Sequence, residues 1–74
     1  MQDDLTKPFS IHLNGKSQTL NAPHTLQTFL AQLTLGKTPF AVEVNGALVP
    51  RSGYTQHQLV ANDRIEIVQA IGGG

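Results

Sequence analysis

The sequence contains no cysteine, few aromatic residues and few charged ones. Without cysteine, the chain has no disulfide bond and no thiolate that acts as a nucleophile or metal ligand. Its five basic and five acidic side chains balance, so a basic surface that follows nucleic-acid phosphates is not expected. No apolar run reaches the roughly 20 residues of a membrane-spanning helix. These absences favour a domain that binds neither nucleic acid nor membrane.

The length of 74 residues allows one domain at most. Residues 1–8 are polar and are predicted to form a loose leader. They carry acidic side chains where a secretory signal needs positive charge, which argues against secretion. We therefore expect a cytoplasmic protein with its domain over residues 9–71 and a flexible glycine tail over residues 72–74. With only three phenylalanines and one tyrosine, the core is expected to consist mainly of leucine, isoleucine and valine.

Alternation of apolar and polar residues predicts several short strands, because successive side chains of a strand point to opposite faces. Asn14-Gly15 and Asn45-Gly46 separate two pairs of these runs and are typical of two-residue hairpin turns. The run Lys16–Leu20 has few apolar side chains, so we expect it at an edge of the sheet. The predicted strands cover residues 9–13, 16–20, 40–44, 47–49 and 64–69.

One amphipathic helix is predicted over residues 26–35. Leucines and a phenylalanine recur there at helical spacing, Thr25 can cap its first turn, and Gly36 can end it. Further along the chain, Leu59 and Val60 are expected to hold the polar loop of residues 51–58 against the core. A single apolar helix stripe must pack on the strands, so the fold class is α+β, with one sheet of about five strands and one helix across it.

The side chains predict no catalytic or metal site. The three histidines lack a ligand spacing, which favours surface or capping roles. Asp63 is expected to hold a turn with its side chain. None of the serines has the context of a nucleophile elbow. The histidines are His12, His24 and His57.

The main chain offers a reactive group instead, because IEIVQAIGGG ends the sequence. The carboxylate of Gly74 is ionised near neutral pH and is a poor electrophile. Transfer of AMP from ATP makes it a mixed anhydride that a sulfur nucleophile can attack. Glycines allow the tail to enter a channel only as wide as a backbone. On the glycines alone, a frayed end or leftover linker explains them equally well.

Ordering such a tail costs about 1–2 kcal/mol per residue, so a partner must bind elsewhere too. We predict that docking involves Val68, Ala70 and Ile71, near the last strand. Val68 shares a face with Arg64 and Glu66. An ordinary exposed valine, or one covered by a loop, is the alternative explanation.

The order of elements and the ending IEIVQAIGGG resemble the ubiquitin-like β-grasp sulfur carriers, above all the ThiS family of thiamine biosynthesis. Val44-Asn45-Gly46, Val49-Pro50-Arg51 and the helix stripe also match that family. The resemblance covers roughly residues 9–74. It implies a mixed sheet in which the first and last strands are parallel neighbours. The leader is a departure from the family, whose members begin almost at the first strand.

The resemblance further implies a carrier that is a substrate and not itself an enzyme. Gly74 would be adenylated by an E1-like adenylyltransferase of the ThiF type, which uses ATP and Mg²⁺, while the carrier itself binds no cofactor. A cysteine desulfurase system would supply sulfur for a Gly74 thiocarboxylate. The carrier would then donate that sulfur to a thiazole synthase of the ThiG type. Gly73 completes the family's Gly-Gly motif, and Gly72 is an additional glycine before it.

Three other functions stay open at this stage. A sulfur carrier for molybdopterin synthesis shares the fold, the Gly-Gly end and the activation chemistry. A protein tag joined to lysines through Gly74 and a plain ubiquitin-like interaction module are the others. Sequence alone identifies neither the immediate sulfur donor nor, without genomic context, the pathway.

Overall fold

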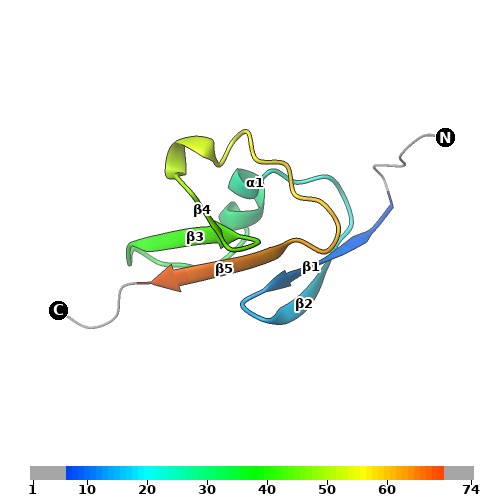
Figure 1. Ribbon diagram of the computed structural model, residues 1–74, viewed down its shortest axis with the longest axis horizontal. Coiled ribbons are helices and arrows are strands. Elements are labelled where there is room, and N and C mark those ends of the chain that lie inside the picture. Colours follow the sequence, from blue (N-terminus) through cyan, green and yellow to red (C-terminus); the bar gives the residue numbers. More distant parts are fainter. Residues whose placement is uncertain (1–6, 70–74) are drawn as a thin grey trace.

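A five-stranded mixed sheet carries one helix across one of its faces in the computed structural model, which describes residues 7–69 (Figure 1). This arrangement confirms the predicted α+β fold class. The spatial order of the strands is β2-β1-β5-β3-β4. In chain order the elements are β1 (Phe9–Leu13), β2 (Lys16–Leu20), α1 (Leu26–Ala31), β3 (Phe40–Val44), β4 (Ala47–Val49), the 3₁₀ helix η1 (Arg51–Gly53) and β5 (Arg64–Gln69).

The last strand lies at the centre of the sheet. β5 pairs in parallel with β1 on one side and antiparallel with β3 on the other. β1–β2 and β3–β4 are antiparallel hairpins, and β2 and β4 form the two edges. The predicted parallel pairing of first and last strands and the predicted edge position of β2 are therefore both confirmed.

The core lies between α1 and the inner face of the sheet. Alternate residues of β1, β3 and β5 point inward, as their period of two predicts. Tyr54 joins the mainly aliphatic core because η1 turns the chain back toward the helix. The buried hydrophobic residues are Ile11, Leu20, Leu26, Phe29, Leu30, Val42, Val44, Tyr54, Leu59 and Ile65.

Both Asn-Gly dipeptides form the predicted tight turns. Asn14 has φ of 49° and Asn45 has φ of 53°, and the following Gly15 and Gly46 both have φ of 86°. Positive φ at both central residues is the conformation that matches the twist of the two flanking strands. Asparagine tolerates this left-handed conformation better than most side chains.

The helix is shorter than predicted. Thr25 caps it as expected, since its hydroxyl accepts a hydrogen bond from the Thr28 amide at 3.2 Å. The helix ends at Ala31 and not near residue 35. Amides of the next two residues bond to carbonyls three residues earlier, which tightens the last turn and ends the helix. Gly36, with φ of 69°, belongs to a separate turn.

The loop before β5 behaves differently from the prediction at one residue. Leu59 is buried, and its amide donates to the His24 carbonyl at 3.0 Å. Val60, expected to pack beside it, is 56% exposed. The Val60 amide donates to the Asp63 carboxylate at 2.9 Å. Val60 is therefore the first residue of a turn, and its side chain faces solvent.

Candidate functional site

The candidate site is built on β5, the strand that leads toward the glycines. Gln69 is the last residue that the structure describes. The predictions for Ala70, Ile71 and residues 72–74 therefore lie outside the described residues. Ile65 is fully buried and Ile67 packs against the same core. These inward side chains therefore hold β5, the strand that precedes the glycines in sequence, against the core.

Two asparagine side chains hold β5 from its two neighbouring hairpins. The Asn14 Oδ1 accepts from the Ile67 amide at 2.8 Å, and the Asn45 Oδ1 accepts from the Arg64 amide at 2.9 Å. The pairing with β1 ends at Ile65, so Asn14 replaces the missing strand partner of the Ile67 amide. Both turns therefore also position the last strand.

Asp63 organises the entry to β5. It is buried, and its carboxylate accepts from the Asn45 side-chain amide and the Val60 amide, both at 2.9 Å. Its own carbonyl accepts from the His12 amide at 2.9 Å. The prediction that Asp63 holds a turn is confirmed, and the structure adds that it links the 45–46 turn to β5.

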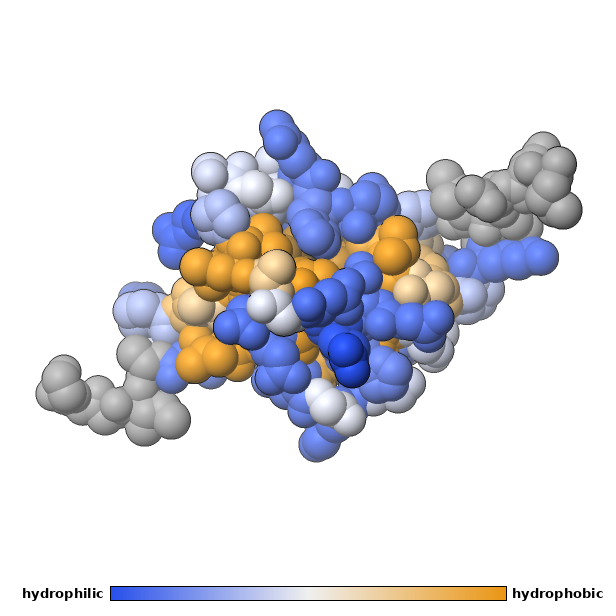
Figure 2. All heavy atoms as spheres, viewed as in Figure 1, coloured by the Kyte–Doolittle hydropathy of each residue, from blue (hydrophilic) through white to orange (hydrophobic). Residues whose placement is uncertain are grey.

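The outer face of the sheet, opposite α1, carries exposed apolar side chains. Val68 is 59% exposed and lies on this face with Arg64 and Glu66, as the alternation predicted. Leu48 on β4 is 65% exposed. Figure 2 shows hydrophobic residues across the middle of the molecule in this view, interrupted and bordered by hydrophilic ones. Within the described part of the chain, the exposed large hydrophobic residues are Leu48, Val60 and Val68.

Two carboxylates lie between Leu48 and Val68 on that face. Glu43 of β3 is in register with Glu66 of β5, and on its other side Glu43 is in register with Leu48. Val68 is in register with Ala41. Directly opposed residues have Cβ atoms about 5 Å apart, and like charges opposed in this way are unfavourable in a sheet.

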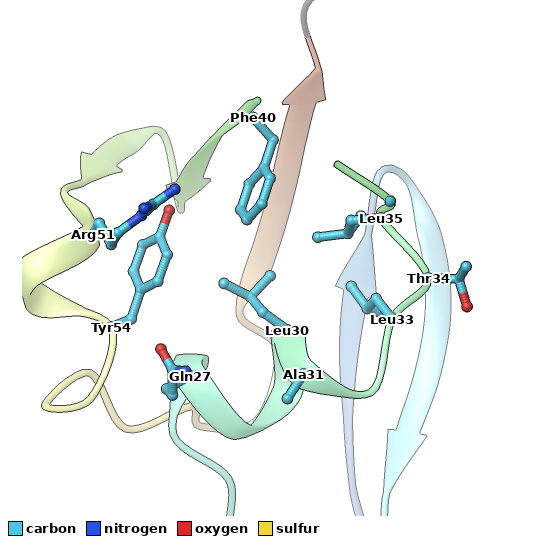
Figure 3. Close-up of a pocket in the computed structure, with 10 residues that line it drawn as sticks. Gln27, Leu30, Ala31, Leu33, Thr34, Leu35, Phe40, Arg51 and Tyr54 are labelled. Atoms are coloured by element: carbon cyan, nitrogen blue, oxygen red, sulfur yellow. The ribbon is translucent and has the colours of Figure 1, made fainter. Parts of the chain in front are cut away.

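A groove of about 670 Å³ lies on the helix side of the sheet (Figure 3). Leu30, Phe40 and Tyr54 contribute apolar walls, and the Arg51 side chain extends toward the hydroxyl end of Tyr54. The groove adjoins the end of β5, because the Gln69 side-chain amide donates to a carbonyl of its lining, that of Leu35, at 3.0 Å.

The histidines do not form a site together. His24 Nδ1 lies 3.1 Å from Thr28 Oγ1, beside the helix cap. His12 is on the outer face of β1, where its Nδ1 is buried without a hydrogen-bond partner, and His57 lies after η1. Among residues 7–69, no cluster of three or more histidine, cysteine, aspartate or glutamate side chains can hold a metal ion.

No helix in the part of the chain that the structure describes is both long and apolar enough to cross a membrane. What this part offers is a rigidly held central strand with an exposed acidic and apolar face beside it. Sequence reasoning missed Glu43 and Leu48 as members of this face. The outward positions of residues 40–44 and 47–49 were the signal, but the pairing register was needed to place them beside Val68.

This combination of sheet order, single helix and central last strand defines the ubiquitin-like β-grasp class. A solved structure of the thiamine biosynthesis protein ThiS from Geobacter metallireducens superposes with a TM-score of 0.77, covering 89% of this chain and all of that one, at 23% sequence identity. The ThiS family model matches residues 11–74. The chain belongs to the ThiS family.

Relatives of known sequence fall into two groups. A thiazole synthase of Magnetococcus marinus is 42% identical over 64 residues, and one of Paramagnetospirillum magneticum is 37% identical over 62 residues. These matches cover 86% and 84% of this chain, which spans only about a fifth of the length of each synthase (20% and 19%). The uncharacterized protein ycf40 of Porphyra purpurea is 30% identical over 70 residues, covering 95% of this chain and 99% of that protein.

Proposed function

We propose that the protein is a sulfur carrier of thiamine biosynthesis whose working group is the carboxylate of Gly74. Membership of the ThiS family is the observation that carries this proposal. The central position of β5 supports it, because a strand bonded on both sides gives a firm base for a tail that enters a partner's active site. The exposed face around Val68 supports a docking role for that residue, with Ala70 and Ile71 beside it in sequence.

The proposed chemistry needs no catalytic side chain from the carrier. A Gly74 carboxylate oxygen attacks the α-phosphorus of ATP in an E1-like adenylyltransferase of the ThiF type, and pyrophosphate leaves. The acyl adenylate then has a good leaving group. The terminal sulfur of a persulfide supplied by a cysteine desulfurase system attacks the carbonyl carbon and AMP leaves, which gives an acyl disulfide. A second thiol of the donor system then attacks the other sulfur, so that the S–S bond breaks, the thiocarboxylate is released and the donor is left as a disulfide. Mg²⁺ neutralises phosphate charge during the first step in the partner enzyme.

Thiazole formation is the proposed destination of the sulfur. Two relatives that contain a segment similar to this chain are named thiazole synthase. Their names favour a ThiG-type acceptor over molybdopterin synthase as the partner of this carrier. Gly72 and Gly73 would allow close approach of the thiocarboxylate to the acceptor, since neither has a Cβ.

Intact mass spectrometry tests the proposal. The full chain is incubated with a ThiF-type enzyme, ATP, Mg²⁺ and a sulfur source, and we expect the mass to change by replacement of one oxygen by sulfur. Fragmentation should place the change at Gly74. Deletion of Gly74 is expected to abolish adenylation without altering the urea unfolding curve. Adenylation of the shortened chain at an unchanged rate would contradict the assignment of the terminal carboxylate.

A further inference from the structure

We infer that the outer face of β3, β4 and β5 binds a partner surface that presents arginine or lysine side chains between apolar ones. The inference rests on the proposed carrier function, because it concerns the enzyme that docks on the carrier. The surface, here called the acidic face, consists of Ala41, Glu43, Leu48, Glu66 and Val68.

The arrangement of the acidic face follows from the strand register. One row across the sheet contains Leu48, Glu43 and Glu66, and the neighbouring row contains Ala41 and Val68. Strands are about 4.8 Å apart, so the first row spans about 10 Å between the outer Cα atoms. Leu48 and Val68, which are 65% and 59% exposed, therefore lie at opposite corners of this small surface, with the two carboxylates between them.

The glutamate pair indicates the charge of the partner. In-register like charges destabilise a sheet and contribute nothing to the fold of the isolated domain. Arg64 lies on the same face, two residues before Glu66 and on the opposite side of Glu66 from Val68, where it is in register with His12 of β1. A cationic side chain placed between Glu43 and Glu66 would relieve the repulsion and form charge-assisted hydrogen bonds to both.

The same charges disfavour other occupants of the acidic face. A second copy of the chain would bring four carboxylates together against apolar side chains, with a large desolvation cost and only the Arg64 of each copy on the same face to offset it. Nucleic acid would be repelled by the two glutamates. The complementary occupant is therefore a basic and apolar protein surface.

Calorimetric titration of the full chain into a ThiF-type adenylyltransferase tests the inference. The double variant Glu43→Gln with Glu66→Gln is expected to bind about tenfold more weakly, with a shallower dependence of Kd on salt. Leu48→Ala with Val68→Ala should weaken binding by a similar factor, with no change in the salt dependence. All four side chains are at least partly exposed, so urea unfolding should remain cooperative.

Matched controls lie away from the acidic face. Gln32→Lys with Gln56→Lys changes the net charge by the same amount, at two exposed residues outside the strands. Val60→Ala removes an exposed apolar side chain from the loop before β5. Both controls should bind within about twofold of the wild type.

The outcomes separate the two proposals. Wild-type binding that the glutamate variant leaves unchanged overturns the basic-partner inference and leaves the carrier function standing. Binding without any adenylation of Gly74 overturns the carrier function alone. Absence of binding overturns the inference, whatever the mass measurement shows. Equal weakening by the glutamate variant and its lysine control also overturns it, because the effect would then come from net charge and not from the acidic face.

Discussion

Asn14 gives the sharpest test of how the last strand is held. Its side-chain oxygen accepts from the Ile67 amide at 2.8 Å, and its backbone has φ of 49°. The residue therefore supports β5 in two separable ways: by one hydrogen bond and by tolerating a left-handed conformation in the turn. Three substitutions at this residue separate the two contributions.

The expected losses of stability form a series. Asn14→Gly keeps the turn and loses the hydrogen bond, so the free energy of unfolding should fall by about 1 kcal/mol. Asn14→Ala loses the same hydrogen bond, and alanine, unlike asparagine and glycine, is disfavoured in the left-handed region, which adds about 1–2 kcal/mol. Asn14→Asp keeps an acceptor oxygen and serves as the control, with a change below about 0.5 kcal/mol.

Two measurements check the series. Urea unfolding gives the change in free energy, with an unchanged m-value as evidence that the unfolded state is comparable. In a domain of this size each kcal/mol also corresponds to a shift in Tm of about 4–8 °C. Amide exchange of Ile67 should quicken about fivefold in Asn14→Gly, because about 1 kcal/mol is lost at that amide.

Two results would refute the reasoning. If Asn14→Gly is as stable as the wild type with Ile67 equally protected, the side-chain bond does not hold β5. If Asn14→Ala and Asn14→Gly lose the same amount, the turn conformation contributes nothing.

Three further substitutions test other contacts by urea unfolding. Asp63→Ala should lose about 2–4 kcal/mol, because the Val60 amide and the Asn45 side chain lose a buried charged acceptor; a loss below 1 kcal/mol would count against this network. Thr25→Ala should lose about 1 kcal/mol through the missing cap, while Thr25→Ser keeps the hydroxyl and stability. Glu43→Gln should gain about 0.2–1 kcal/mol by removing the repulsion from Glu66, and the gain should shrink at high salt; a loss at low salt would show that the pair is not repulsive.

Local patterns predicted the elements because each depends on a few neighbouring residues. The alternation in residues 40–44 places inward and outward side chains correctly, and both Asn-Gly turns have the expected backbone. The Thr25 cap is local as well. Family resemblance then supplied the parallel pairing of the first and last strands, which no local pattern contains.

Predictions that depend on contacts between distant residues were less successful. The helix ends four residues early, and a side chain from β5 binds the Leu35 carbonyl in the segment expected to be helical. Val60 faces solvent because Asp63 binds its amide. The support that Asn14 gives to β5 joins residues 53 positions apart, so its sequence pattern shows only a turn.

For the candidate site, the sequence placed Val68 on the correct face of the last strand but not its neighbours. Ala41, Glu43 and Leu48 come from two other strands, and their proximity depends on the pairing register. The predictions for Gly72, Gly73 and Gly74 stay predictions, since these residues are outside the structural description. The intact-mass experiment is their test.

The central position of β5 also constrains how the chain is made. The β1–β2 hairpin and the β3–β4 hairpin do not pair with each other. Each hairpin joins the sheet only through β5, which pairs with β1 on one side and with β3 on the other. Isolated two-stranded hairpins are marginally stable in water. During synthesis we therefore expect the two hairpins to stay separate until residues 64–69 have left the ribosome and can pair between them. A chain that lacks residues 64–69 cannot join its two hairpins into one sheet, so we expect the domain to fold only after this strand has been synthesised.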